Sequence, residues 1–293
     1  MTIRPANAPV SWGVMEVEGW SPPLAYWRFL DELKAAGYEA TELGPYGYLP
    51  TDPGRLKQEL ERRSLRLISA FVPLRLKDPE VDLGPARQVG QLLGALGAPC
   101  LVLSDALWPE RQAVAGRAAE SQVHLTDPEW QTVAANVAAV CRLAAGLGLG
   151  CVFHHHAGTY VETPTEVRRL LASTEVGLCL DTAHYVYGGG DPVEAVESFG
   201  RRVEYLHFKD LDPARLAAAR RDRLGFLDGV RAGVFCPLGT GVVRFRELLE
   251  ALDGIGYDGW AVVEQDVDAA PAGSSAPFEN ARASREYLRG LGV

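Results

Sequence analysis

Residues 150–181, GCVFHHHAGTYVETPTEVRRLLASTEVGLCLD, contain the repeating unit from which the fold can be inferred. An apolar run at 150–155 is followed by a helical pattern at 163–173 and by a second apolar run at 176–181. Continuous apolar runs are typical of strands that are covered on both faces, and a Thr or Pro at the start of a helical pattern is a helix-start signal. The stretch therefore predicts a strand, a helix and a second strand.

The same alternation runs through the rest of the chain. Further strands are predicted at 8–12, 39–43, 65–72, 99–104, 203–208 and 260–264. Further helices are predicted at 24–37, 52–63, 86–97, 130–148, 191–200, 243–256 and 284–292. Eight strand–helix units in series indicate a parallel sheet and favour a closed (β/α)8 TIM barrel, with residues 1–293 as one domain. An open doubly wound sheet is the alternative, but the GxGxxG fingerprint that would favour it does not follow the first predicted strand.

Composition narrows the class of protein. The chain has 293 residues, and its net charge of −9 argues against a nucleic-acid partner, which normally needs a clustered basic excess. The N-terminus has no apolar signal-peptide core, and no apolar run reaches the ~20 residues that span a bilayer. The five cysteines are an odd number without a CxxC spacing, as expected for buried thiols in a reducing compartment. We therefore expect a soluble cytoplasmic protein with no membrane partner.

Two connections stand out. Residues 209–241 form an unusually long link after the seventh predicted strand, and long loops inside compact domains are usually functional. Residues 271–277, PAGSSAP, are predicted to be a flexible loop before the last helix.

Polar side chains gather where the last four predicted strands end. They are His154, His155, His156 and Glu162 after the fifth strand, Asp181 and His184 after the sixth, His207 and Lys209 after the seventh, and Glu264 and Asp266 after the eighth. Barrel active sites lie at these strand ends. Because side chains alternate along a strand, His155 is predicted to point toward the helices, without a chemical role. Three carboxylates and an imidazole at corresponding heights suit a divalent ion that prefers oxygen, such as Mn²⁺, Mg²⁺ or Co²⁺.

These residues also have ordinary structural interpretations. Asp181 can cap the following helix, and His207 can be a strand histidine with satisfied hydrogen bonds. Lys209 can pair with Asp210 or Asp212. The recurrence of such residues on four consecutive strands favours a shared metal site.

Six motifs carry a resemblance to a known family. They are APVSWG (8–13), HHHAGTYVETP (154–164), CLDTAHYVYGGGDP (179–192), HFKD (207–210), AGVFCPLGTG (232–241) and GWAVVEQD (259–266). Together they resemble the inosose dehydratase (2-keto-myo-inositol dehydratase) branch of the xylose isomerase-like TIM barrels, over nearly the whole chain. The chain departs from this branch at 239–241, where GTG stands in place of the Gly-Asp-Gly that is often found there.

The resemblance implies a catalytic site. A divalent ion, Mn²⁺ or Co²⁺ with Mg²⁺ as a further candidate, would be held by Glu162, Asp181, His207 and Glu264. The candidates for proton transfer are His156, His184 and Lys209. From their positions in the sequence, we also expect the substrate to contact Asn7, Ser11, Trp12 and Glu16, because the loop after the first predicted strand faces the barrel mouth. His154 and Asp266 are expected to contact it from the strand ends. Core packing is the alternative role for Trp12.

The reaction that the resemblance implies is metal-dependent dehydration of a keto-inositol, 2-keto-myo-inositol, in inositol catabolism. A base removes the proton next to the ketone, the ion stabilises an enediolate, and an acid protonates the departing hydroxyl. A ketose isomerase or epimerase would use the same ion and the same intermediate, and is the alternative.

Two other classes fit less well. A non-catalytic sugar-binding barrel should lack one or more of the four ligands, and all four are present. A metal-dependent endonuclease needs more histidine ligands and a basic groove, which the net charge of −9 opposes. The predicted partner is therefore a small-molecule polyol or keto-sugar, and the oligomeric state, including a homo-oligomer, is left open.

Overall fold

The computed structural model describes residues 2–17, 20, 24–268 and 276–293. Its parallel strands are β1 (Thr2–Asn7), β2 (Ala40–Glu42), β3 (Arg66–Ser69), β4 (Phe71–Leu74), β5 (Cys100–Asp105), β6 (Gly150–His154), β7 (Gly177–Asp181), β8 (Val203–Phe208) and β11 (Asp258–Val263). They form one sheet in the order β3-β2-β1-β11-β8-β7-β6-β5-β4. Only Ala70 separates β3 from β4 in the chain, so one interrupted strand joins the two ends of the sheet. The predicted (β/α)8 TIM barrel is confirmed.

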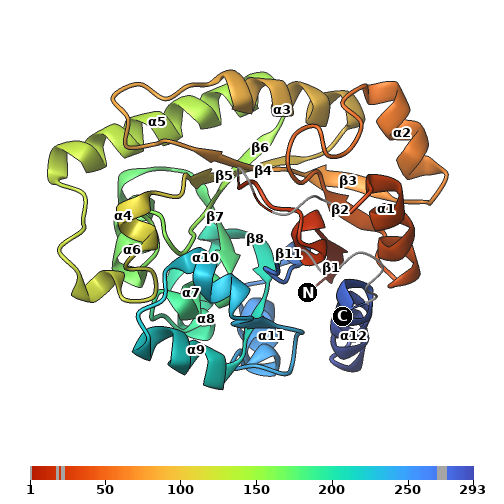
Figure 1. The fold of residues 1–293 in the computed structure, drawn as a ribbon. Coiled ribbons are helices and arrows are strands. Elements are labelled where there is room, and N and C mark those ends of the chain that lie inside the picture. The colour runs from red at the N-terminus through yellow and green to blue at the C-terminus, as the bar shows by residue number, and fades with distance from the viewer. Residues whose placement is uncertain (1, 18–19, 21–23, 269–275) are drawn as a thin grey trace.

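The longer helices cover the outside of this barrel (Figure 1). The helices that follow the barrel strands are α1 (Tyr26–Ala35), α2 (Pro53–Glu61), α3 (Gly84–Leu96), α4 (Pro109–Gln112), α5 (Asp127–Gly146), α6 (Pro164–Ser173), α7 (Thr182–Tyr187), α8 (Pro192–Phe199), α11 (Phe245–Gly254) and α12 (Ala276–Gly290). Both α5 and α6 begin with a capping box, built by Thr126 with Glu129 and by Thr163 with Glu166, which satisfies backbone N–H groups of the first turn. Within the described parts of the chain, no helix combines the length and apolar character that crossing a membrane demands.

Apolar packing fills two layers, one inside the barrel and one between strands and helices. Val102, Val152 and Cys179 face the barrel interior. Their neighbours in the chain, such as Leu101 and Phe153, pack in the layer beneath the helices. Alternate residues of one strand are therefore buried on opposite faces, which explains why each strand is a continuous apolar run.

The prediction of a first strand at 8–12 is wrong. β1 ends at Asn7, and Pro9–Trp12 form a 3-10 helix that ends at Gly13, with φ of +77°. Proline has no N–H for a central strand but starts a helix readily. Residues 2–7 are the strand because they pair with β11 along their whole length.

The long connection at 209–241 is folded. It contains α9 (Pro213–Arg221), α10 (Phe226–Arg231) and an antiparallel pair of short strands, β9 (Asp210–Leu211) and β10 (Phe235–Cys236). Of the predicted loop at 271–277, residues 271–275 lie outside the described residues, and the last two residues begin α12.

The glycine run after α7 packs closely against the loop that follows β6. A Cβ atom on Gly188 would overlap the backbone carbonyl oxygen of Glu162. Gly189 has φ of +91°, a conformation that other residues rarely adopt. The GGG motif is therefore a requirement of backbone packing beside the barrel mouth.

We expect Gly188→Ala to lower the free energy of unfolding by about 1–3 kcal/mol, because the added methyl group forces the two loops apart. Gly146→Ala is the matched control. A Cβ at Gly146, the last residue of α5, meets no other atom within 4 Å, so alanine should be neutral or stabilising by up to about 1 kcal/mol. Denaturant unfolding of both variants tests this, and equal effects would contradict the packing explanation.

Candidate active site

The carboxyl ends of the strands surround a small cavity with a volume of about 50 Å³. Of the residues predicted to form the site, the cavity is lined by Glu16, His154, His156, His207, Lys209, Glu264 and Asp266. Glu42 and Phe71 complete the polar and aromatic parts of its wall. The strand ends therefore bring most of the predicted residues together.

His207, near the end of β8, lies between two carboxylates. Its Nε2 atom is 3.1 Å from Glu42 Oε1, and its Nδ1 atom is 2.9 Å from Glu264 Oε2. Nδ1 is buried and makes no hydrogen bond. If Nε2 carries the proton that is donated to Glu42, the lone pair of Nδ1 faces a carboxylate, and such a contact needs a cation or a second proton between its atoms.

The contacts of Glu42 explain how His207 is held. Glu42 ends β2, and its Oε1 atom also accepts hydrogen bonds from Ser69 Oγ at 2.8 Å and from Tyr205 OH at 3.1 Å. Metal-binding histidines commonly donate their second N–H to such a carboxylate, which fixes the ring. Sequence reasoning missed Glu42, although its position at the tip of a predicted strand is the same signal that identified Asp181.

Asp181 combines two of its predicted roles. Its Oδ1 atom accepts the backbone N–H of His184 at 2.8 Å and caps α7. Its Oδ2 atom faces the site, 3.3 Å from His154 Nε2 and 3.8 Å from His207 Nδ1. The helix cap and the site are therefore compatible, because each uses a different oxygen.

Lys209 places its ammonium group among three carboxylates. Nζ lies 2.8 Å from Asp266 Oδ1, 3.0 Å from Glu264 Oε2 and 3.4 Å from Asp181 Oδ2. Burial opposes the charge, but Asp181, Asp266 and Glu264 raise the pKa of Lys209 well above its usual value. Burial likewise opposes ionisation of Glu264, yet His207 and Lys209 lower its pKa to about 2.

The structural alternative for Lys209, a pair with Asp210 or Asp212, is wrong. The carboxylate of Asp210 accepts the backbone N–H groups of Gly239 and Gly241, each at 3.0 Å. Asp212 caps α9. Asp210 therefore organises the GTG turn at which the chain departs from its resemblance, and Thr240 of this turn is exposed.

His156 and His184 stack beside the cavity, with ring centroids 3.8 Å apart. Two aromatic rings from the long connection cover them: Phe226 lies 4.8 Å from His156, and Phe235 lies 5.6 Å from His184, between centroids. Burial is the main cause that lowers the pKa of both histidines. Both imidazoles are therefore neutral near pH 7 and can accept a proton.

The other two histidines differ in role. Burial lowers the pKa of His154 to about 3, and its ring lines the cavity next to Asp181. His155 instead accepts the backbone N–H of Asp181 and packs against Tyr185 on the helix side of the strand, as its place in the alternation indicates.

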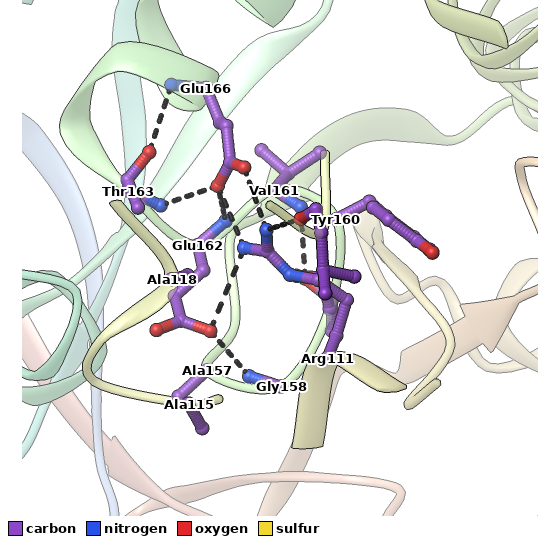
Figure 2. Close-up of polar contacts among 12 residues, drawn as sticks. Arg111, Ala115, Ala118, Ala157, Gly158, Tyr160, Val161, Glu162, Thr163 and Glu166 are labelled. Carbon is purple, nitrogen blue, oxygen red and sulfur yellow. Dashed lines mark hydrogen bonds and ion pairs between the residues drawn. The ribbon is translucent and has the colours of Figure 1, made fainter. Parts of the chain in front are cut away.

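Glu162 lies apart from the other three predicted ligands. Its carboxylate is fully buried and accepts the backbone N–H of Gly116 at 2.6 Å and that of Gly158 at 2.8 Å. Figure 2 shows it beside Arg111, whose Nη2 atom is 3.8 Å from Glu162 Oε2. Burial raises the pKa of Glu162 to about 7, against the lowering effect of Gly158, Arg111 and Gly116. Within the described residues, four groups of side chains lie close enough to share a metal ion, and none of them includes Glu162: His154, Cys179 and His207; His154, Asp181 and His184; His156, His184 and Asp266; and Glu42, His207 and Glu264.

The N-terminal residues divide between the cavity and the core. Glu16 lines the cavity, and burial raises its pKa to about 8. Trp12 is buried against Phe29 and donates its Nε1–H to Glu32, so core packing is its role in this structure. Ser11 Oγ accepts the backbone N–H of Gln265 and ties the first loop to the last strand.

Asn7 also has a local role, since its side-chain oxygen accepts the backbone N–H of Ala8. Its Nδ2 atom is buried without a hydrogen-bond partner. Ser11 and Trp12 lie in the 3-10 helix at Pro9–Trp12, which the sequence patterns did not reveal, so their side chains do not alternate as they would on a strand.

Comparison with known proteins identifies the family of this chain. The xylose isomerase-like TIM barrel family matches residues 30–291. An inosose dehydratase of Lacticaseibacillus casei is 32% identical, over 98% of this chain and 97% of its own length. The rhizopine catabolism protein MocC of Rhizobium meliloti is 35% identical, over 98% of this chain and 88% of its own length.

Solved structures share the fold. The crystal structure of the IOLI protein with a bound zinc atom has a TM-score of 0.71 at 14% identity, and the match covers 99% of this chain and 98% of that one. Its similarity is one of fold alone. With the full-length relatives, it follows that this chain belongs to the inosose dehydratase branch, a group of hydro-lyases, within the xylose isomerase-like TIM barrel family.

Proposed function

We propose that this chain removes water from a keto-inositol, 2-keto-myo-inositol, in inositol catabolism. The full-length relatives named inosose dehydratase support the substrate. The observation that carries the chemistry is the convergence of side chains beside the cavity, where His207 Nδ1 lies 2.9 Å from Glu264 Oε2 and 3.8 Å from Asp181 Oδ2.

The residues present fit a divalent ion. We propose Asp181, His207 and Glu264 as ligands, as the sequence predicted, with His154 in the place expected for Glu162. Two carboxylates and two imidazoles suit Mn²⁺ or Co²⁺, and leave Mg²⁺ as the less favoured ion. Glu42 would orient the ring of His207 through Nε2. When bound, the ion supplies Lewis-acid stabilisation of the negative charge that develops on the substrate's ketone oxygen.

The other side chains would transfer protons. His156 is neutral and lines the cavity, so it is our candidate for the base that removes the proton next to the ketone, giving an enediolate. Lys209 stays charged, so it can donate a proton or a hydrogen bond to oxygen but cannot act as a base near pH 7. His184 lies 3.2 Å from Lys209 and would relay protons to it. Asp266 and Glu16 would bind hydroxyl groups.

The product tests the proposed reaction. Purified chain should be loaded with Mn²⁺ or Co²⁺ and offered 2-keto-myo-inositol, with ketoses offered in parallel. We expect a dehydrated diketone that mass spectrometry identifies by the loss of one water. Interconversion of ketoses or epimers without this product would refute dehydration and support the isomerase alternative.

Removing one ligand should remove the ion. We expect Glu264→Gln to lose both Mn²⁺ binding, measured by titration calorimetry, and turnover, because a neutral amide replaces a carboxylate ligand. Chelation of the wild-type chain should abolish activity, and added Mn²⁺ or Co²⁺ should restore it. Normal Mn²⁺ affinity in Glu264→Gln would contradict the proposed ligand set.

Removing the ammonium group of Lys209 should lower turnover without weakening Mn²⁺ binding. Lys209→Met takes away a positive charge that lies 3.0 Å from Glu264 and 3.4 Å from Asp181. We therefore expect Mn²⁺ to bind at least as tightly, while kcat falls by about 10²-fold or more, as for the loss of a proton donor. Weaker Mn²⁺ binding, or unchanged kcat, would show that Lys209 has another role.

A further inference from the structure

The peptide unit between Ala157 and Gly158 links Glu162 to His156. The N–H of Gly158 donates to Glu162 Oε2 at 2.8 Å. The carbonyl oxygen on the other side of the same planar unit, that of Ala157, lies 2.7 Å from His156 Nδ1. A carbonyl can only accept, so Nδ1 must carry the proton and Nε2 keeps its lone pair.

We propose that Glu162 is a positioning residue for His156, acting through the Ala157–Gly158 peptide to hold that histidine as its Nδ1–H tautomer. The carboxylate fixes the direction of the Gly158 N–H. Because the peptide unit is planar, this also fixes the direction of the Ala157 carbonyl, which accepts the hydrogen bond from His156 Nδ1. Nε2 is thereby kept free to accept a proton. The catalytic part of this inference rests on the dehydratase function proposed above, whereas the tautomer does not.

The backbone at this point needs such a partner. Gly158 has φ of +83°, and a glycine lets the preceding peptide turn over at little steric cost. The turn itself is otherwise tied to His156, whose carbonyl accepts the Thr159 hydroxyl at 2.8 Å and whose N–H donates to Val161. Those bonds do not involve the N–H of Gly158, so its hydrogen bond to Glu162 is the one that orients the Ala157–Gly158 peptide plane.

The second carboxylate oxygen of Glu162 is also held by a hydrogen bond. Its Oε1 atom accepts the N–H of Gly116, which belongs to the connection after β5. Arg111, fully buried, forms a two-pronged pair with Glu166 at 3.0 Å for each contact and donates its Nε–H to the carbonyl of Thr159 at 2.6 Å. Figure 2 shows Arg111 between the carboxylates of Glu162 and Glu166. The carboxylate is thus anchored between two loops and a buried guanidinium.

The neighbouring histidine is held by the same residue of the loop. The N–H of Ala157 donates to His184 Nδ1 at 3.3 Å, and Lys209 Nζ lies 3.2 Å from His184 Nε2. That atom is 3.3 Å from Asp266 Oδ2. Ala157 therefore contacts both histidines, through its carbonyl oxygen at His156 and through its N–H at His184.

The test is the tautomer of His156 in the full-length chain labelled with ¹⁵N-histidine. Long-range ¹H–¹⁵N correlation spectra distinguish the two tautomers, and His156→Gln assigns the resonance by its loss. We expect the Nδ1–H form in the wild type. In Glu162→Gln one neutral carbonyl oxygen replaces two charged acceptors, so the hydrogen bond from Gly158 is either lost or weakened; the peptide is held less firmly, and the Nε2–H form should gain population.

Kinetics and metal binding provide the second readout. We expect Glu162→Gln to lower kcat by about 10–100-fold, with KM little changed, because a histidine in the wrong tautomer cannot act as base. Mn²⁺ affinity measured by calorimetry should stay at the wild-type value. Loss of Mn²⁺ from Glu162→Gln would instead make Glu162 a ligand and overturn the proposal.

Matched variants separate positioning from stability. Glu120→Gln makes the same change at an exposed residue near Gly116 and should behave as wild type. Glu166→Gln weakens the Arg111 pair and should lower the unfolding temperature while the His156 tautomer is kept. If Glu166→Gln shifts the tautomer as much as Glu162→Gln does, general loosening of the loop explains both results and the proposal is overturned.

Two outcomes complete the test. If Glu162→Gln does not fold, Glu162→Asp keeps the buried charge but withdraws the carboxylate by one methylene, and the same tautomer shift is expected; an unchanged tautomer overturns the proposal. If the wild-type chain releases no dehydrated product, the proposed reaction fails, whereas a tautomer shift in Glu162→Gln still supports the positioning role.

Discussion

The ammonium group of Lys209 is the contact on which the barrel mouth depends. It lies within 2.8–3.4 Å of Asp266, Glu264 and Asp181, and all four side chains are buried. Uncompensated buried carboxylates are costly, so these strand ends can converge only around a positive charge. The strand positions alone would bring like charges together, and Lys209, directly after β8, makes their convergence compatible with folding.

The same cluster divides the titratable groups into two kinds. Carboxylates hold Lys209 in its charged form, while burial among aromatic rings keeps His156 and His184 neutral. A proton donor and proton acceptors thus lie within a few ångströms of each other, with Lys209 Nζ 3.2 Å from His184 Nε2. Environments that drive neighbouring pKa values apart are how one site performs both acid and base chemistry near pH 7.

The sequence predicted the barrel and the residues that strands carry, because the two-residue alternation of a strand determines both height and face. Asp181 and His207 follow from this rule, and Glu42 could have been found by it. Glu162 could not, since it lies in a loop whose path depends on a buried arginine from another connection. The packing of Trp12 was hidden from the sequence for a related reason: Pro9–Trp12 form a 3-10 helix in place of the predicted strand, and the indole packs against Phe29 of α1.

The buried network of Arg111, Glu162 and Glu166 is better explained by geometry than by stability. Replacing buried ion pairs with apolar residues is often neutral or stabilising, so a fully buried guanidinium with two carboxylates is a poor way to gain folding energy. Such a network fixes orientation, because each carboxylate oxygen accepts and each N–H group donates a hydrogen bond only in certain directions. Here the hydrogen bonds of Glu162 orient the Ala157–Gly158 peptide, whose carbonyl oxygen contacts His156. A loop that carries a proton acceptor needs this directional hold more than the strands do, because no sheet fixes its peptide planes.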